Sequence, residues 1–151
     1  MGFSAQEVAD IKASWEVPKA NLTDSGAAIL VHFVTKYPDN LMHFPFKDVP
    51  IVDLNKNERF RSHVTKIMKV FDNSVNVLGA DEAQITQIWQ DLAKSHVKRQ
   101  IPEKSYLELR DSILTVLSEA AKLTDAQKAS WHKMLDHVYA ILFQKMSELG
   151  A

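Results

Sequence analysis

The chain has 151 residues, with 18 lysines and arginines against 19 aspartates and glutamates, so its net charge is −1. This length predicts a single domain that spans residues 1–151. The near-neutral charge argues against a nucleic-acid binder, which would carry a basic face. The chain has no cysteine, which excludes disulfides, zinc–thiolate sites, iron–sulfur clusters and thiol catalysis.

Glycine is scarce, and the N-terminus carries no targeting signal. The four glycines stand at positions 2, 26, 79 and 150, too far apart for a glycine-rich phosphate loop or a Gly-x-Ser-x-Gly elbow. The first residues show no basic segment followed by an apolar one, so we expect an intracellular, cytoplasmic protein. The densest apolar stretch, residues 27–34, is far shorter than the ~20 residues of a membrane span.

The first two helices are predicted from capping residues and apolar spacing. Ser4 and Glu7 fit a capping box, so a helix should follow and end near Pro18. Thr23 or Asp24 can cap a second helix, whose apolar positions repeat at three and four residues and which ends before the next proline. Gly26 lies inside this helix, where it predicts a close crossing of two helices.

The middle of the chain is predicted as a corner followed by a long helix. Residues 37–54 hold three prolines, and we expect an irregular corner with one short helical turn. Asn55 and Glu58 resemble a second capping box. The helix after them should stop at Gly79.

Three further helices complete an all-α prediction. Asp81 and Glu82 suit a helix N-terminus, and Pro102 suits the first turn of the next helix. Thr124 and Gln127 form a third capping box, opening a helix that ends before the glycine at 150. The pattern therefore gives six substantial helices and no convincing strand.

Two of the six histidines face the expected core. His63 lies three residues after Phe60 and four before Ile67, and His96 lies four after Leu92. These spacings put each imidazole on the apolar face of its helix. A histidine on such a face is more often a satisfied core residue than a ligand, but two on neighbouring helices indicate a site that takes two imidazoles.

A haem fits these histidines better than other metal groups do. No glutamate has a histidine three residues later, as a di-iron bundle needs, and His132 and His137 are five apart rather than four, which disfavours a zinc helix. A haem needs an axial imidazole, an apolar slot and cations for its propionates. Arg99, Lys66 and Arg59 supply the cations. The slot is predicted from Leu30, Phe33, Phe44, Ile67, Leu92, Ile101, Tyr106 and Val138.

The chain resembles the globin family, and most closely the intracellular haemoglobins of flies, the botfly larval protein among them. The resemblance runs from Trp15 to Met146. It is carried by Phe44 six residues after Pro38, by His63 with an apolar residue one turn later, and by the segment from Leu92 through His96 to Pro102.

The resemblance implies a globin fold of six to eight helices around one haem b. It makes His96 the proximal iron ligand and His63 the distal residue, which either contacts O₂ or becomes a sixth ligand. It makes Phe44 the corner residue that packs on the haem. Leu30 stands where some high-affinity globins carry tyrosine, which leaves His63 as the obvious distal donor. Ser95 and the carbonyl of Leu92 are candidate partners for the second ring nitrogen of His96.

Three classes of function follow. The favoured one is reversible binding of O₂, with CO and NO as further diatomic ligands, for storage or facilitated diffusion and without enzymatic turnover. The alternative is a haem redox enzyme or sensor, such as an NO dioxygenase or a peroxidase, with a bis-histidine resting state. The third is a helical interaction protein without haem. A homodimer, known among insect relatives, stays open.

Overall fold

The computed structural model describes residues 2–150, and within them the chain is all-α. Capping residues set most of the helix starts. Ser4 caps α1 (Ala5–Lys19) and Thr124 caps α6 (Asp125–Glu148), each through the predicted capping box. Asp81 caps α4 (Glu82–His96), also as predicted. Pro102 is the N-cap of α5 (Glu103–Ala121) rather than a residue of its first turn.

Two helix starts differ from the prediction. The N-cap of α2 (Leu22–Lys36) is Asn21, whose side chain accepts a hydrogen bond from the backbone N–H of Asp24. The N-cap of α3 (Glu58–Val77) is Asn57 rather than Asn55, and its side chain accepts from the backbone N–H of Phe60. In both places an asparagine closer to the first helical turn satisfies the free backbone donors, which is the role of an N-cap.

The corner between α2 and α3 is more helical than expected. It contains two 3₁₀ helices, η1 (Pro38–His43) and η2 (Ile51–Lys56), where one short turn was predicted. A third, η3 (Val97–Arg99), follows α4 directly. The corner brings Phe44 and Phe46 together as stacked rings with centroids 4.9 Å apart, and so builds an aromatic wall next to α3.

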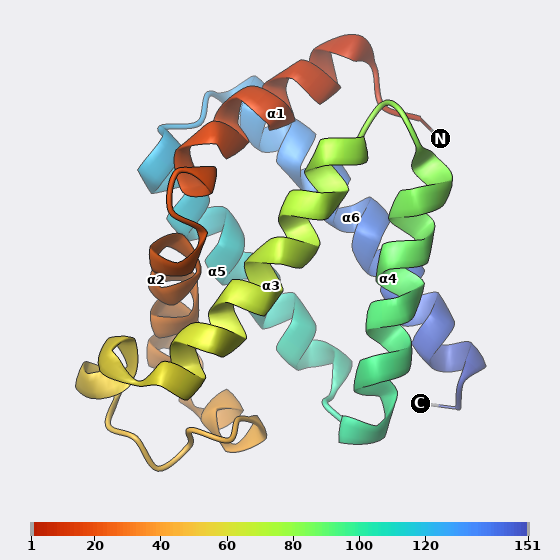
Figure 1. Ribbon diagram of the computed structural model, residues 1–151. Helices are drawn as coiled ribbons and strands as arrows, with labels where there is room; N and C mark the ends of the chain where they lie inside the picture. The colour runs from red at the N-terminus through yellow and green to blue at the C-terminus, as the bar shows by residue number, and fades with distance from the viewer. Residues whose placement is uncertain (1, 151) are drawn as a thin grey trace.

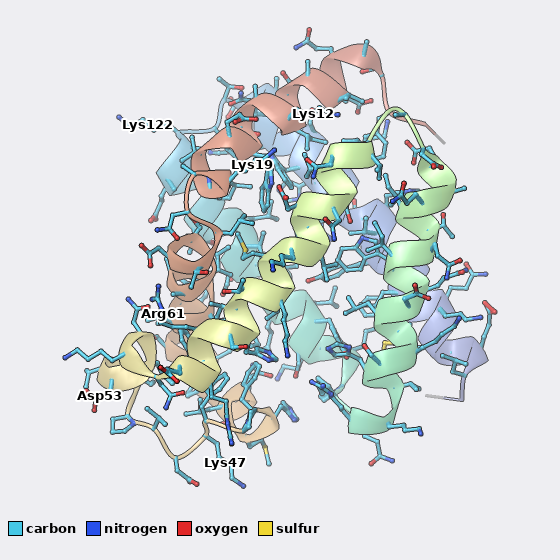
Figure 2. The ribbon with its side chains drawn as sticks, in the orientation of Figure 1. Lys12, Lys19, Lys47, Asp53, Arg61 and Lys122 are labelled. Carbon is cyan, nitrogen blue, oxygen red and sulfur yellow. The ribbon has the colours of Figure 1, made fainter. Side chains whose placement is uncertain are left out.

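The helices pack in two crossing layers around a buried core (Figure 1). In this view α3 passes in front of α5, and α4 runs beside α6. Charged side chains such as Lys47 and Lys122 point outward from the bundle (Figure 2). Among residues 2–150, no helix combines the length and the apolar character that a bilayer crossing demands.

Gly26 marks the predicted close crossing, between α2 and α3. A Cβ atom at this position would lie 2.6 Å from Cγ of Met68 and 3.1 Å from the carbonyl oxygen of Val64. The missing side chain therefore lets the two helices approach to backbone contact. This approach fixes the position of α3, the helix that carries His63.

Candidate functional site

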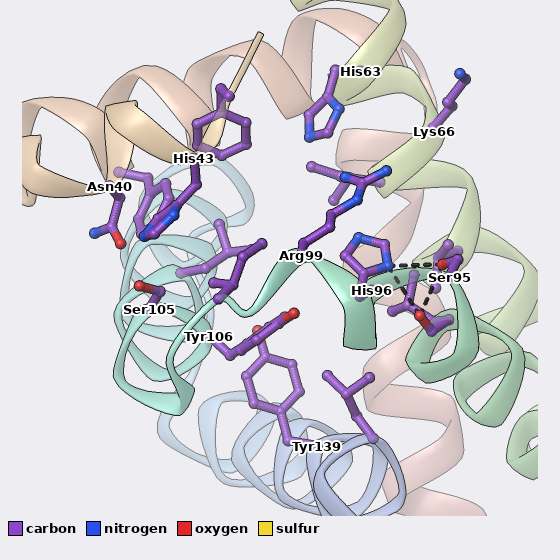
Figure 3. Close-up of a pocket in the computed structure, with 18 of the residues that line it drawn as sticks. Asn40, His43, His63, Lys66, Ser95, His96, Arg99, Ser105, Tyr106 and Tyr139 are labelled. Atoms are coloured by element: carbon purple, nitrogen blue, oxygen red, sulfur yellow. Dashed lines mark hydrogen bonds between the residues drawn. The ribbon is translucent and has the colours of Figure 1, made fainter. Parts of the chain in front are cut away.

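A cavity of about 360 Å³ lies in the middle of the fold, lined by residues of η1, η3 and the helices α2 to α6. This volume falls within the range of roughly 300–1,000 Å³ that small-molecule and cofactor sites occupy. Its lining is mostly apolar, with a few polar and charged side chains between the aromatic ones (Figure 3). Both His63 and His96 line it.

Most of the predicted slot residues line this cavity, and two do not. The structure brings Phe33, Phe44, Ile67, Leu92, Ile101 and Tyr106 into the lining, together with Lys66 and Arg99. Leu30 and Val138 instead lie in the core, fully buried and outside the lining. Helical spacing correctly predicted that both side chains face inward. It does not show whether an inward-facing side chain reaches the cavity.

Other lining residues were not found from the sequence. They are Asn40, His43, Val70, Phe71, Trp89, Ser105, Leu109, Tyr139 and Leu142. The apolar ones lie on the apolar faces of their helices. The periodic spacing of these faces was the sequence feature that could have pointed to them. Asn40 and His43 come from the 3₁₀ helix η1, where no helical periodicity could have pointed to them.

His96 is the last residue of α4, and its ring orientation is fixed by its own helix. Its Nδ1 lies 2.9 Å from the carbonyl oxygen of Leu92 and 2.8 Å from the hydroxyl of Ser95. The hydroxyl of Ser95 also donates to the carbonyl of Leu92, at 2.9 Å. Because a carbonyl oxygen can only accept, Nδ1 carries the proton. The lone pair is therefore on Nε2, the atom that can bind a metal.

His63 enters the cavity from α3 and packs against two stacked aromatic rings of the corner. Its ring centroid lies 5.2 Å from that of Phe44 and 5.8 Å from that of Phe46, both edge to face. Burial, with help from the positive charges of Arg99 and Lys66 and from His96, lowers the pKa of His63 to about 4. The imidazole is therefore neutral at physiological pH, so one ring nitrogen can donate and the other can accept or bind a metal.

The rim of the cavity is positively charged. Among residues 2–150, neither Lys66 nor Arg99 has a carboxylate within ion-pair distance. Arg59, the third predicted cation, does not line the cavity. It lies in an adjoining hollow at the start of α3 that His63 and Lys66 also border. Two unpaired cations at the mouth of an apolar cavity suit a ligand that carries carboxylates at one edge.

The comparisons with known proteins agree with this architecture. Residues 27–142 match the family model for globins. The chain belongs to the globin family. A solved Drosophila melanogaster globin is 46% identical with a TM-score of 0.91, and 94% of each chain is covered. Haemoglobin from the botfly Gasterophilus intestinalis is 38% identical with a TM-score of 0.90, covering 96% of this chain and 99% of its own.

A further structure describes cyanide binding by a hexa-coordinate haemoglobin of Drosophila melanogaster, 46% identical with a TM-score of 0.90 over 93% of this chain and 94% of its own. Globin CTT-VI of Chironomus thummi thummi is 28% identical, over 90% of this chain and 83% of its own. The predicted resemblance to insect haemoglobins is thereby confirmed, as are the all-α class and the globin fold.

The residues of this globin's cavity fit a haem. Within residues 2–150, no three histidine, aspartate or glutamate side chains come together as metal ligands. A metal held by His96, or by His96 and His63 together, therefore needs further donors from a cofactor. A porphyrin provides four nitrogens, an apolar face for the aromatic walls, and carboxylates for Lys66 and Arg99.

Proposed function

We propose that this globin binds haem b between His96 and His63 and uses it for reversible O₂ binding, in storage or facilitated diffusion. The observation that carries the proposal is the protonated Nδ1 of His96, which leaves Nε2 free for iron in an apolar cavity. When bound, the haem supplies an iron whose sixth position takes a diatomic ligand. CO and NO are expected to bind at the same position.

Each flanking residue has a separate role. His96 holds its proton at Nδ1 against the carbonyl of Leu92, so its ring stays aimed into the cavity. His63 is neutral and would offer a donor N–H to bound O₂, which carries partial negative charge. Phe44 and Ile67 exclude water from the cavity, and Lys66 and Arg99 would hold the haem carboxylates.

A bis-histidine form is the second candidate, with redox or sensing chemistry as its function. One comparison favours it: a similar Drosophila globin is described as hexa-coordinate. In such a form His63 would itself bind the iron, and O₂ would have to displace it. The apparent O₂ affinity then falls by the fraction of molecules in which the site is open. The homodimer remains a prediction.

The absorption spectrum of the purified ferrous protein, first without O₂ and then with it, tests the proposal. We expect a Soret band, and a single broad visible band that splits on oxygenation. Two sharp visible bands before oxygen is admitted would indicate that His63 is already a ligand and would favour the second candidate. Protein without a Soret band, even after haemin is added, would contradict both and favour a helical interaction protein without haem.

The variant His96→Gly tests the proximal assignment. We expect it to lose haem, and added imidazole to restore the Soret band, because free imidazole can replace the missing ring. His132→Ala is the matched control, since His132 contacts Arg110 and does not line the cavity. Unchanged haem binding in His96→Gly would overturn the assignment.

A further inference from the structure

Two tyrosine hydroxyls lie in the part of the cavity below His96. Tyr106 comes from α5 and Tyr139 from α6, and both line the cavity. In Figure 3 the two phenol rings end in the same region, on the side of the cavity away from His63. The hydroxyl of Tyr106 is buried and makes no hydrogen bond with any described residue. A buried hydroxyl without a hydrogen-bond partner destabilises the fold, so a bound molecule that bonds to it is favoured.

The packing of both rings prevents the hydroxyls from reaching protein partners elsewhere. Phe143 holds both rings edge to face, with centroids 5.9 Å from Tyr106 and 5.7 Å from Tyr139. The ring of Trp89 lies 6.1 Å from that of Tyr139 on another side. Tyr139 is only 4% exposed. Neither phenol can therefore turn toward solvent without breaking this aromatic cluster.

Arg99 also lines the cavity and its charge acts on Tyr106, but its side chain reaches between His63 and His96 in Figure 3. Most other polar groups are already engaged or lie elsewhere. The indole N–H of Trp89 donates to the hydroxyl of Ser74 at 2.9 Å, and Nδ1 of His96 is bound to Leu92 and Ser95. Ser105 lies at the other end of the cavity in Figure 3, beside Asn40 and His43. Burial raises the pKa of Tyr106 and of Tyr139, so both stay protonated and can donate as well as accept.

We propose that the His96 side of the cavity is a polar subsite, which binds one small hydrogen-bonding molecule, water in the resting protein, between the hydroxyls of Tyr106 and Tyr139. A purely apolar cavity stays dry and admits apolar atoms such as xenon, whereas a polar one of sufficient size holds water. The subsite therefore selects hydrogen-bonding molecules over apolar gases. The inference rests on the proposed function in that the haem separates this side from the His63 side.

Crystals of the purified protein, with and without xenon pressure, test the subsite. In the wild type we expect a water within hydrogen-bond distance of both hydroxyls and no xenon there. In Tyr106→Phe we expect the water to be lost and xenon to enter. Tyr37→Phe is the matched control, because Tyr37 bonds to Asp111 and does not line the cavity, and it should keep the wild-type pattern.

Xenon in the wild-type subsite would overturn the proposal, as would a bond from the Tyr106 hydroxyl to the haem or to a protein group. These outcomes are independent of the proposed function, which fails instead by the absence of a Soret band.

Thermal unfolding gives a second measurement that does not depend on crystals. Losing a water-mediated bond in Tyr106→Phe should lower Tm by about 2–4 °C, as expected for one net hydrogen bond in a chain of this size. Removing a hydroxyl that has no partner would leave Tm unchanged or raise it, and that result would contradict the proposal.

Discussion

The Nδ1 atom of His96 lies 2.9 Å from the carbonyl oxygen of Leu92, one helical turn earlier on α4. The hydroxyl of Ser95 contacts the same nitrogen at 2.8 Å and the same carbonyl at 2.9 Å. The imidazole is thus held by a main-chain acceptor that no side-chain substitution removes, and by a hydroxyl that can be removed.

The substitution Ser95→Ala should weaken haem retention only modestly. It deletes one neutral hydrogen bond, of about 0.5–1.5 kcal/mol, while the bond to Leu92 remains. We expect haem to dissociate roughly 2- to 13-fold faster, measured by transfer to an excess of a haem-free acceptor globin. Thr86→Ala, which removes an exposed hydroxyl elsewhere on α4, is the control. Loss of haem as complete as in His96→Gly would mean that Ser95, and not Leu92, is the main support of the ring.

The substitution His63→Leu should raise the O₂ dissociation rate. Hydrogen bonds to charged groups contribute about 1.5–3 kcal/mol, which corresponds to roughly 10- to 150-fold in that rate. Stopped-flow displacement of O₂ by CO measures it. His43→Leu is a useful comparison because His43 also lines the cavity, from η1. An unchanged rate in His63→Leu would show that another residue is the donor.

The substitution Gly26→Ala should destabilise the protein although alanine favours helices. The higher helix propensity of alanine raises the free energy of unfolding by about 1 kcal/mol, but overpacking lowers it by about 1–3 kcal/mol. The new Cβ would lie 2.6 Å from Cγ of Met68 and 3.1 Å from the main-chain oxygen of Val64, which cannot easily move. Urea unfolding should therefore show a net loss, and the same substitution should cost less when it is made in a Met68→Ala background, where the closest contact is gone. Increased stability of Gly26→Ala alone would mean that the helices can separate at no cost.

The haem-free protein should lose stability as the pH falls from about 6.5 toward 4. Burial lowers the pKa of His63 to about 4, whereas the unfolded chain binds that proton near 6.5. The unfolded state therefore takes up protons first, and the free energy of unfolding declines through this window. The loss due to His63 is at most about 3 kcal/mol, reduced by solvent screening of this half-buried group.

The comparison of wild type with His63→Gln isolates this contribution. The free energy of unfolding, from urea titrations of the haem-free protein between pH 7 and 4, should fall less steeply with acid in His63→Gln. Parallel curves for the two proteins would show that His63 is not protected from protonation.

Local sequence signals placed the helices well because capping is a short-range interaction. The boxes at Ser4 and at Thr124 need only residues three apart, and both formed as predicted. The prediction that Asn55 caps α3 was wrong: the N-cap is Asn57, because its place relative to the helix depends on how η2 ends. The position of the N-cap therefore depends on the path of the whole corner, which no local sequence pattern predicts.

The sequence was sufficient to predict that two histidines face the candidate site. It was not sufficient to predict all the residues that line the cavity. The spacing of His63 and His96 within their helices was sufficient to turn both toward the core. The hydroxyl of Tyr139 reaches the same cavity from α6, but its position depends on how α6 packs against α4 and α5. Packing of this kind brings together residues far apart in the chain. It also places Leu30 in the core, outside the lining of the cavity.

The three tryptophans divide unequally between the cavity and the rest of the core. Trp89 forms part of the cavity wall, while Trp15 and Trp131 lie against each other outside it, with ring centroids 5.6 Å apart. An absorbing cofactor beside Trp89 would quench its emission most strongly. Tryptophan fluorescence should therefore report whether the cavity is occupied, with Trp89 as the indole that lies against the occupant.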